Sequence, residues 1–152
     1  LAFCRGWGKL RRMSTPVKHS ITIIQGTTQR VPLVRQYVEY AVKSMDCGGG
    51  YVDACTGAPV PPGDLRDEDY TGCTARMQLR EDVDSSAVLW EMSTDDGRIE
   101  LDGNTLTLVF DAADSSSFAF DSAIGHVEVT RPNGDVERQY EIKFKVSREG
   151  TR

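Results

Sequence analysis

The sequence predicts an all-β fold, an antiparallel β-sandwich of about seven to eight strands with one long inserted loop. Three observations predict it: short stretches of alternating apolar and polar residues recur along the chain, glycine-containing turns separate them, and no stretch has the periodicity of a long helix. Hydrophobic residues make up 39% of the 152 residues and charged residues 27%, a balance typical of a folded globular domain.

A glycine turn separates the first two predicted strands. "HSITIIQG" (19–26) is a short apolar strand, and "QRVPLVRQYVEYAV" (29–42) is a second strand rich in valine and tyrosine. Pro32 cannot donate a backbone hydrogen bond, so that part of the second strand is expected at a sheet edge or a bulge. A helix over residues 33–42 is the alternative.

The next segment, residues 43–69, is predicted to be a loop inserted into the sandwich. It contains three consecutive glycines and a Pro-Pro pair, and both favour turns over regular strands. Its middle, "YVDAC" (51–55), has the composition of a short strand. A connection of this length is long for a compact domain, and such loops are often functional or disordered.

The clearest alternation lies in the second half of the chain. Every second residue of "CTARMQLR" (73–80) is apolar, which predicts a strand with one face on a core. "AVLWEMST" (87–94) and "RIELD" (98–102) are predicted to flank a hairpin turn, because the Asp-Gly of the intervening "TDDGR" is a strong hairpin signal. The alternation returns in "NTLTLVFD" (104–111).

The last third predicts a crossover followed by a hairpin. "AADSSSFAF" (112–120) breaks the alternation and is typical of a helical turn or a crossover. In "GHVEVTRPNGDVERQYEIKFKV" (125–146), Asn133-Gly134 predicts a two-residue hairpin turn. The residues expected to face the core are Val127, Val129, Tyr140, Ile142, Phe144 and Val146.

We expect one domain, residues 16–152, preceded by a disordered basic tail, residues 1–15. The chain opens on leucine, and translation is expected to begin at Met13, with a genuine basic tail as the alternative. The first twelve residues carry +4 and the whole chain −5, so the remainder carries −9. This acidic body argues against nucleic acid as a partner, and no run is long and apolar enough for membrane insertion.

No pattern in the sequence predicts catalysis, and no cofactor or metal site is expected. His19 and His126 are the only histidines, both are expected at the surface, and no "GxSxG" elbow is present. The run "CGGGY" lacks the lysine of a phosphate-binding loop. Acidic clusters at 64–70, 80–86 and 93–97 do not have the spacing of a calcium-binding EF-hand.

The four cysteines leave three interpretations open. They are free thiols, a disulfide between Cys47 and Cys55 across the turn "GGGYVDA", or a zinc site. Zinc has the least support, because the sequence contains no CxxC pair. Cys73 is expected to face the core as a small apolar side chain.

Three pieces of the sequence together resemble small Ig-like structural proteins of tailed bacteriophages. They are "DYTGCTARMQLRED", "VLWEMSTDDGRIELDGNTLTLVFDA" and "GHVEVTRPNGDVERQYEIKFKVSREGTR". The match covers residues 19–31 and 69–152, with Tyr70 at the position of a leucine in the family pattern. A weaker resemblance is to the N-terminal domain of phage baseplate upper proteins.

The resemblance implies an Ig-like β-sandwich that serves as a non-enzymatic structural protein of a virion, made in the host bacterial cytoplasm and used in the tail or baseplate for assembly or attachment. Its expected partners are other virion proteins and further copies of itself in a symmetric assembly. A head decoration or head–tail joining protein is an alternative place in the particle. Two other classes stay open: an acidic regulator that inhibits a host protein, and a carbohydrate-binding sandwich.

Two regions are the predicted partner contacts. One is the loop 43–69, which a sandwich does not need, and the other is the C-terminal run 147–152, which extends past the last expected core residue. A flexible loop and a frayed end are the alternative interpretation. The predicted contact residues are Tyr51, Asp64, Arg66, Asp67, Arg148, Glu149 and Arg152.

Overall fold

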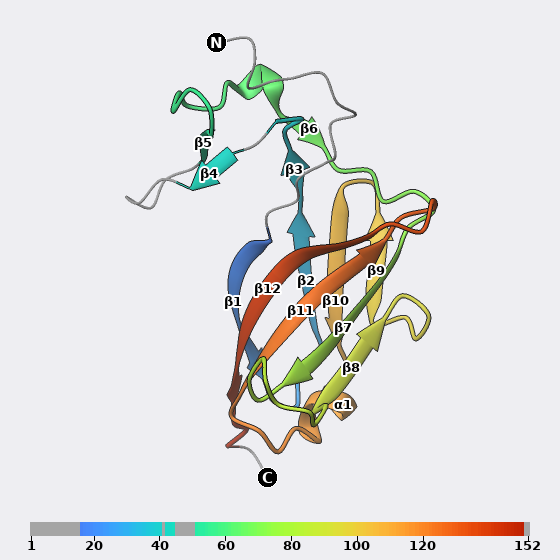
Figure 1. The fold of residues 1–152 in the computed structure, drawn as a ribbon. Helices are drawn as coiled ribbons and strands as arrows, with labels where there is room; N and C mark the ends of the chain where they lie inside the picture. Colours follow the sequence, from blue (N-terminus) through green and yellow to red (C-terminus); the bar gives the residue numbers. More distant parts are fainter. Residues whose placement is uncertain (1–15, 41, 45–50, 151–152) are drawn as a thin grey trace.

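The computed structural model describes residues 16–40, 42–44 and 51–150, and these form a β-sandwich (Figure 1). A five-stranded sheet has the order β1-β12-β11-β7-β8 and a three-stranded sheet the order β2-β10-β9, which confirms the predicted all-β sandwich. The first sheet contains β1 (Val17–Ile24), β7 (Thr74–Arg80), β8 (Trp90–Ser93), β11 (Ser122–Thr130) and β12 (Val136–Ser147). The second contains β2 (Gln29–Val34), β9 (Ile99–Asp102) and β10 (Thr105–Phe110). The expected basic tail and Met13 lie outside the described residues.

The core between the sheets comes from the residues that the alternation selects. Along β7, β10 and β11, every second side chain is buried, and its neighbours face outward. All six residues expected to face the core in the last hairpin are buried. Cys73 is only partly buried, and it packs against the rim of this core.

One pairing departs from the predicted antiparallel arrangement. β1 runs parallel to β12, with Val17 opposite Tyr140 and Ile24 opposite Ser147. The other pairings within the two sheets are antiparallel. Parallel neighbours need a long connection, and here the chain between β1 and β12 supplies it. The alternation within a strand does not show the direction of its neighbour, so the sequence carries no sign of this pairing.

The second predicted strand is divided in the structure. β2 lies at the edge of its sheet, which confirms the expected place of Pro32. After Val34 the chain continues into a separate two-residue strand, and residues 33–40 contain no helix. The helical alternative for this segment is therefore wrong over those residues.

The Asp-Gly turn does not form the predicted hairpin. Residues 94–97 leave β8 in the five-stranded sheet and enter β9 in the three-stranded sheet, with Gly97 in the left-handed region at φ +77°. The actual hairpin joins β9 to β10 through Gly103 and Asn104, and Gly103 has φ +56°. A turn sequence fixes the local backbone but not which strands pair on either side of it.

The Asn133-Gly134 turn is also longer than predicted. The amide of Gly134 donates to the carbonyl of Arg131, and the amide of Arg131 donates to the carbonyl of Asp135. The loop between these paired residues therefore has three residues, 132–134, with Gly134 at φ +92° and Asn133 not in the left-handed region. This is a type I turn followed by a left-handed glycine, not a two-residue turn.

The predicted crossover between the sheets is confirmed. A short helix, α1 (Ala112–Ser116), follows β10, and the chain then enters β11 in the opposite sheet. No helix in the part of the chain that the structure describes is long and apolar enough to cross a membrane.

The predicted inserted loop contains regular structure. Within residues 43–69 it contains the end of β4 (Val42–Ser44), β5 (Tyr51–Asp53), the 3-10 helix η1 (Pro62–Asp64) and β6 (Arg66–Asp67). β3 (Gln36–Tyr37) lies before it, in the second predicted strand. β3 pairs with β6 and β4 with β5, both antiparallel, and β5 confirms the short strand expected in "YVDAC". We call residues 36–40, 42–44 and 51–67 the insert; these residues stand beyond one end of the sandwich, above β2 in Figure 1.

Candidate functional site

The insert presents three of its four predicted contact residues to solvent. Tyr51 is 43% exposed on β5, and Arg66 and Asp67 are exposed on β6. Asp64 is half-buried, and its Oδ2 accepts a hydrogen bond of 2.7 Å from the hydroxyl of Tyr40. Asp67 accepts one of 3.0 Å from the side chain of Gln36. The two acids therefore also brace the insert internally, while Tyr51 and Arg66 remain accessible.

A tight loop follows β5 and is held by one buried carboxylate. Asp53 Oδ1 accepts hydrogen bonds from the backbone amides of Cys55 (2.8 Å) and Thr56 (3.2 Å), and Gly57 has φ +72°. Cys55 is disulfide-bonded, so its interpretation as a free thiol is wrong, whereas Cys73 is a free thiol. The predicted partner of Cys55, Cys47, lies outside the described residues.

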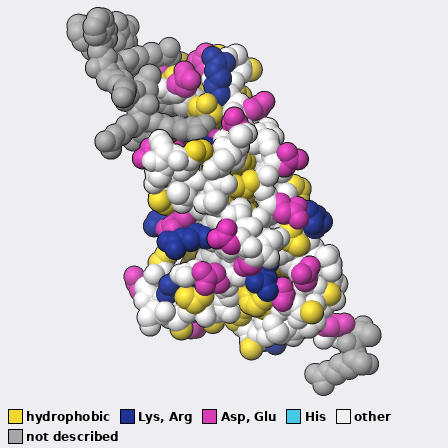
Figure 2. Space-filling view, turned by 90° about the vertical axis from the view of Figure 1, so that its right-hand side faces the viewer, with side chains coloured by type: hydrophobic (Ala, Val, Ile, Leu, Met, Phe, Trp, Pro, Cys, Tyr) yellow, Lys and Arg dark blue, Asp and Glu magenta, His cyan; other side chains and the backbone are white. Residues whose placement is uncertain are grey.

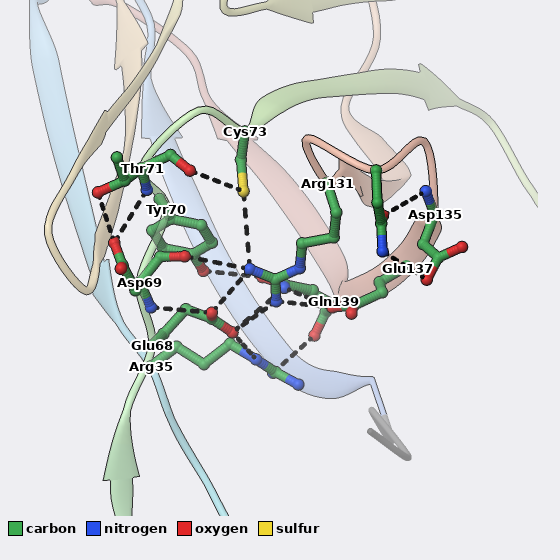
Figure 3. A network of polar contacts seen from close by, with 11 residues as sticks. Arg35, Glu68, Asp69, Tyr70, Thr71, Cys73, Arg131, Asp135, Glu137 and Gln139 are labelled. Carbon is green, nitrogen blue, oxygen red and sulfur yellow. Dashed lines mark hydrogen bonds and ion pairs between the residues drawn. The ribbon is translucent and has the colours of Figure 1, made fainter. Parts of the chain in front are cut away.

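The insert joins the sandwich at a buried group of charged and polar side chains, shown in Figure 3. Glu68, directly after β6, lies at its centre with a side chain only 1% exposed. Its two carboxylate oxygens accept from the two terminal nitrogens of Arg131, at 2.9 and 3.0 Å. We call this group the junction cluster; its members are Arg35, Glu68, Arg131, Glu137 and Gln139.

The junction cluster takes side chains from β12 and from the residues that directly follow β2, β6 and β11. Arg35, which follows β2, places its Nε 3.5 Å from Glu68 and donates from Nη1 to the carbonyl of Gln139. Arg131, at the start of the β11–β12 turn, also donates to Glu137, at 2.8 Å. The two arginines and two glutamates balance in charge, which offsets the cost of burying them.

A β-bulge brings Gln139 into the junction cluster. The register between β11 and β12 shifts after Val127, so that Gln139 is the extra residue of β12 and is buried next to the buried Tyr140. Its side-chain amide donates to Glu137 at 3.0 Å, and its carbonyl oxygen accepts from the hydroxyl of Tyr70 at 2.7 Å. The bulge therefore re-aims a polar side chain inward, a common use of bulges.

The buried setting changes the pKa of two groups at the junction. Burial lowers the pKa of Arg131, but the hydrogen bonds and charges of Glu68 and Glu137 outweigh it, so the pKa of Arg131 lies above its usual value. Burial raises the pKa of Tyr70 far above its ordinary value, and the neighbouring Tyr140 and Glu68 raise it further. At neutral pH the arginine is charged and the tyrosine is protonated.

The C-terminal run lies at the opposite end of the sandwich from the insert (Figure 1). Arg148 donates to Asp121 at 2.8 Å and to the carbonyl of Ala119 at 3.0 Å. The backbone amide of Glu149 donates to the side chain of Gln25 at 3.1 Å. Arg148 and Glu149 therefore tie the chain end to neighbouring loops, and Arg152 lies outside the described residues.

The described parts of the two predicted regions present charged and polar side chains at their surfaces. The described residues contain no group of three or more His, Cys, Asp or Glu side chains placed to hold a metal ion. The side of the molecule in Figure 2 shows acidic and basic side chains interspersed, without a large area of one sign. What the insert offers chemically is a braced surface of mixed charge with an accessible tyrosine, which suits contact with another protein.

Sequence reasoning missed the junction cluster. Glu68 falls in the acidic stretch "DLRDEDY", which has the composition of a solvated turn, and Arg35 lies in a segment with a strand pattern. Arg138 is polar at the position where the alternation that ends in Tyr140, Ile142 and Phe144 calls for an apolar residue, which is the one local sign of a bulge. Glu68 and Arg131 are 63 positions apart and Arg35 and Gln139 are 104 apart, and such distant pairings have no signal in a single sequence.

Comparisons with known proteins find similarity among solved structures. No protein-family model matches it, and no curated protein matches it. Among solved structures, it is similar to extracellular domains 3–5 of OTK from Drosophila, with a TM-score of 0.32 and 13% sequence identity. The match covers 93% of this chain, which spans 37% of that chain, and a likeness at this level identifies neither a family nor a function.

Proposed function

We propose that this chain is a non-enzymatic structural module of a tailed-bacteriophage virion, placed in the tail or baseplate, that docks to other virion proteins through its insert. The support from the sequence is the resemblance of the segments over residues 69–152 to small phage structural proteins. The single structural observation that carries the docking surface is the attachment of the insert: it stands off the sandwich, yet a buried, charge-balanced cluster fixes its base.

The rigid base matters because docking through a mobile loop has an entropic cost. A segment that is ordered before it meets its partner loses less conformational entropy on binding. The pairing of β3 with β6, the pairing of β4 with β5 and the hydrogen bond between Tyr40 and Asp64 order the insert in the isolated chain. Tyr51 and Arg66 are the accessible side chains of the types most often found at the centre of protein interfaces.

Mass spectrometry of gradient-purified phage particles tests the proposal. Peptides of this chain are expected in stoichiometric amount, and chemical cross-links from the insert to a tail or baseplate protein are expected rather than links to the head. Links to head proteins would move the module to a decoration or joining role. Absence from particles, with abundance in infected cells, would overturn the virion assignment in favour of the regulator.

A pair of variants tests the surface itself. Tyr51→Ala combined with Arg66→Glu is expected to lower incorporation into particles during complementation of a phage that lacks the gene. Glu100→Ala, on the outer face of the three-stranded sheet, is the control and is expected to incorporate normally. Equal incorporation of both variants would show that the insert is not the contact.

A further inference from the structure

A second surface, independent of the insert, lies on the outer face of the five-stranded sheet. This face is turned toward the viewer in Figure 1, and the loop between β7 and β8 lies at its lower end. Val83, in this loop, lines the same hollows as Ile124 and His126 of β11, so the loop rises over the face rather than extending away from it. The face therefore has a raised part and, beside it, a depressed part.

The depressed part is a hollow of about 530 Å³ over β1, β11 and β12. Its charged lining is mostly basic: Lys18 from β1, and Arg138 and Lys143 from β12, face one acid, Glu141. Glu141 lies 4.0 Å from Arg138. Lys18 and Lys143 are both exposed and have no ion-pair partner within the described residues.

The raised part has the opposite charge. The loop contains Glu81, Asp82 and Asp84, all exposed, and no basic residue from position 81 to position 89. Its carboxylates have no ion-pair partner in the described ranges. Val83, between the acids, is 62% exposed, so a partner that covers the loop would remove apolar surface from water. Arg80 fixes the loop from below through a hydrogen bond of 2.8 Å to the carbonyl of Ser85.

We propose that two copies of this chain pair face to face through this surface, with the acidic loop of each copy seated in the basic hollow of the other. A two-fold axis that lies in the contact plane, between loop and hollow, exchanges the two positions, so one arrangement satisfies both contacts. Each loop then brings three carboxylates to the two unpaired lysines of its partner, and Val83 is removed from water. The occupant is a second copy because the same chain supplies both halves of the complementarity.

Paired charge-reversal variants test this contact by sedimentation equilibrium of the full-length chain. At low salt, the native chain is expected to have twice the monomer mass, and the mass is expected to fall toward the monomer in 1 M salt, because salt screens exposed charges. Lys18→Glu/Lys143→Glu and Glu81→Lys/Asp84→Lys are each expected to be monomeric. Their equimolar mixture is expected to regain the doubled mass, since each reversed surface then meets its complement.

Several outcomes would overturn the proposal. A native chain that stays monomeric at millimolar concentration, or a dimer that persists in both variants, would show that this face is not the contact. A mass above two copies would show a head-to-tail arrangement instead of a two-fold one. Thermal unfolding of each variant checks its folding, and the salt dependence of the native chain needs no variant. The proposed dimer contact does not use the insert. A negative result here therefore does not bear on the proposed function, which the particle experiment tests separately.

Discussion

The sandwich and the insert bury different kinds of side chain. The two sheets meet through a continuous apolar cluster that includes Phe110, Phe118 and Phe144, whose rings contact edge to face. Among the insert residues whose burial is described, only Val52 and Asp53 are buried, and Val52 lies outside that cluster. The insert is held instead by short ribbons, a disulfide-bonded cysteine and the polar junction cluster at its base.

This difference implies that substitutions change the free energy of unfolding of the two parts in different ways. An apolar core is stabilised in proportion to the surface it removes from water, and it tolerates exchange of one apolar shape for another. A buried charge cluster contributes little net stability when complete, but loses much when one member is removed, because the remaining charges stay buried without a partner. Substitutions in the two regions should therefore produce distinct patterns of damage.

The largest effect is expected from Phe110→Ala in the sandwich. Phe110 is 1% exposed between Phe118 and Phe144, so truncation leaves a cavity and should lower the free energy of unfolding by about 3–5 kcal/mol. Urea unfolding monitored by circular dichroism measures the change. The neighbour Val109 points away from the core, and Val109→Ala should cost well under half as much; similar costs for the two would mean that the core does not dominate.

The next effect is expected from Glu68→Ala at the junction. The change leaves Arg35 buried without its carboxylate partner and leaves Arg131 paired with Glu137 alone. It should cost about 3 kcal/mol, with faster hydrogen exchange in β3 and β6. Glu100→Ala is the matched control, because Glu100 pairs with Arg30 at the surface, where an ion pair contributes at most about 1 kcal/mol. If urea unfolding gives both variants the same cost, the junction cluster is not what fixes the insert.

How far the sequence predicts each region follows from the same contrast. The core strands can be predicted because alternation with a period of two is a local pattern. Met77 and Leu79, or Leu106 and Leu108, are predicted to face the core without knowledge of the partner strand. The junction cluster has no such pattern, since it depends on which distant segments meet. Residues such as Glu68 therefore have the composition of a surface turn, although the fold buries them.

The predictions of the hairpin turns and of the strand directions were wrong for a related reason. The Asp-Gly at positions 96 and 97 sets a backbone conformation, and the structure keeps it, but whether the flanking strands pair depends on the other sheet. The parallel pairing of β1 with β12 joins the two ends of the domain and is equally invisible locally. Tyr51, Arg66 and Asp67 are exposed on the insert, and their role as partner contacts stays a prediction.

Alkaline pH should destabilise the fold through Tyr70, whose ring lies in the apolar core and whose hydroxyl bonds to Gln139 of the junction cluster. The folded-state pKa of Tyr70 is raised mainly by burial, so its contribution to stability is complete below the unfolded pKa of about 10 and is lost as pH rises above it. The loss approaches about 1.4 kcal/mol per pH unit for one tyrosine. In Tyr70→Phe, urea unfolding between pH 9 and 11 should show a shallower decline than in the native chain; parallel declines would contradict the pKa shift.

The smallest effect is expected at the C-terminal end, where Arg148 ties the chain to Asp121 across the surface. The side chains of Arg148 and Asp121 are 52% and 81% exposed, so solvent and salt screen their attraction, and Arg148→Ala should cost no more than about 1 kcal/mol. Hydrogen exchange should nevertheless rise near Ala119 and Gln25, because Arg148 also donates to the Ala119 carbonyl and the amide of Glu149 next to it donates to the side chain of Gln25. Arg30→Ala breaks another exposed ion pair, the one with Glu100, and should cost a similar amount. It should leave hydrogen exchange near Ala119 and Gln25 unchanged. A loss of unfolding free energy from Arg148→Ala as large as that from Glu68→Ala would mean that contacts of the chain end stabilise the fold as strongly as the base of the insert does. The contrast between the two ends of the sandwich would then no longer hold.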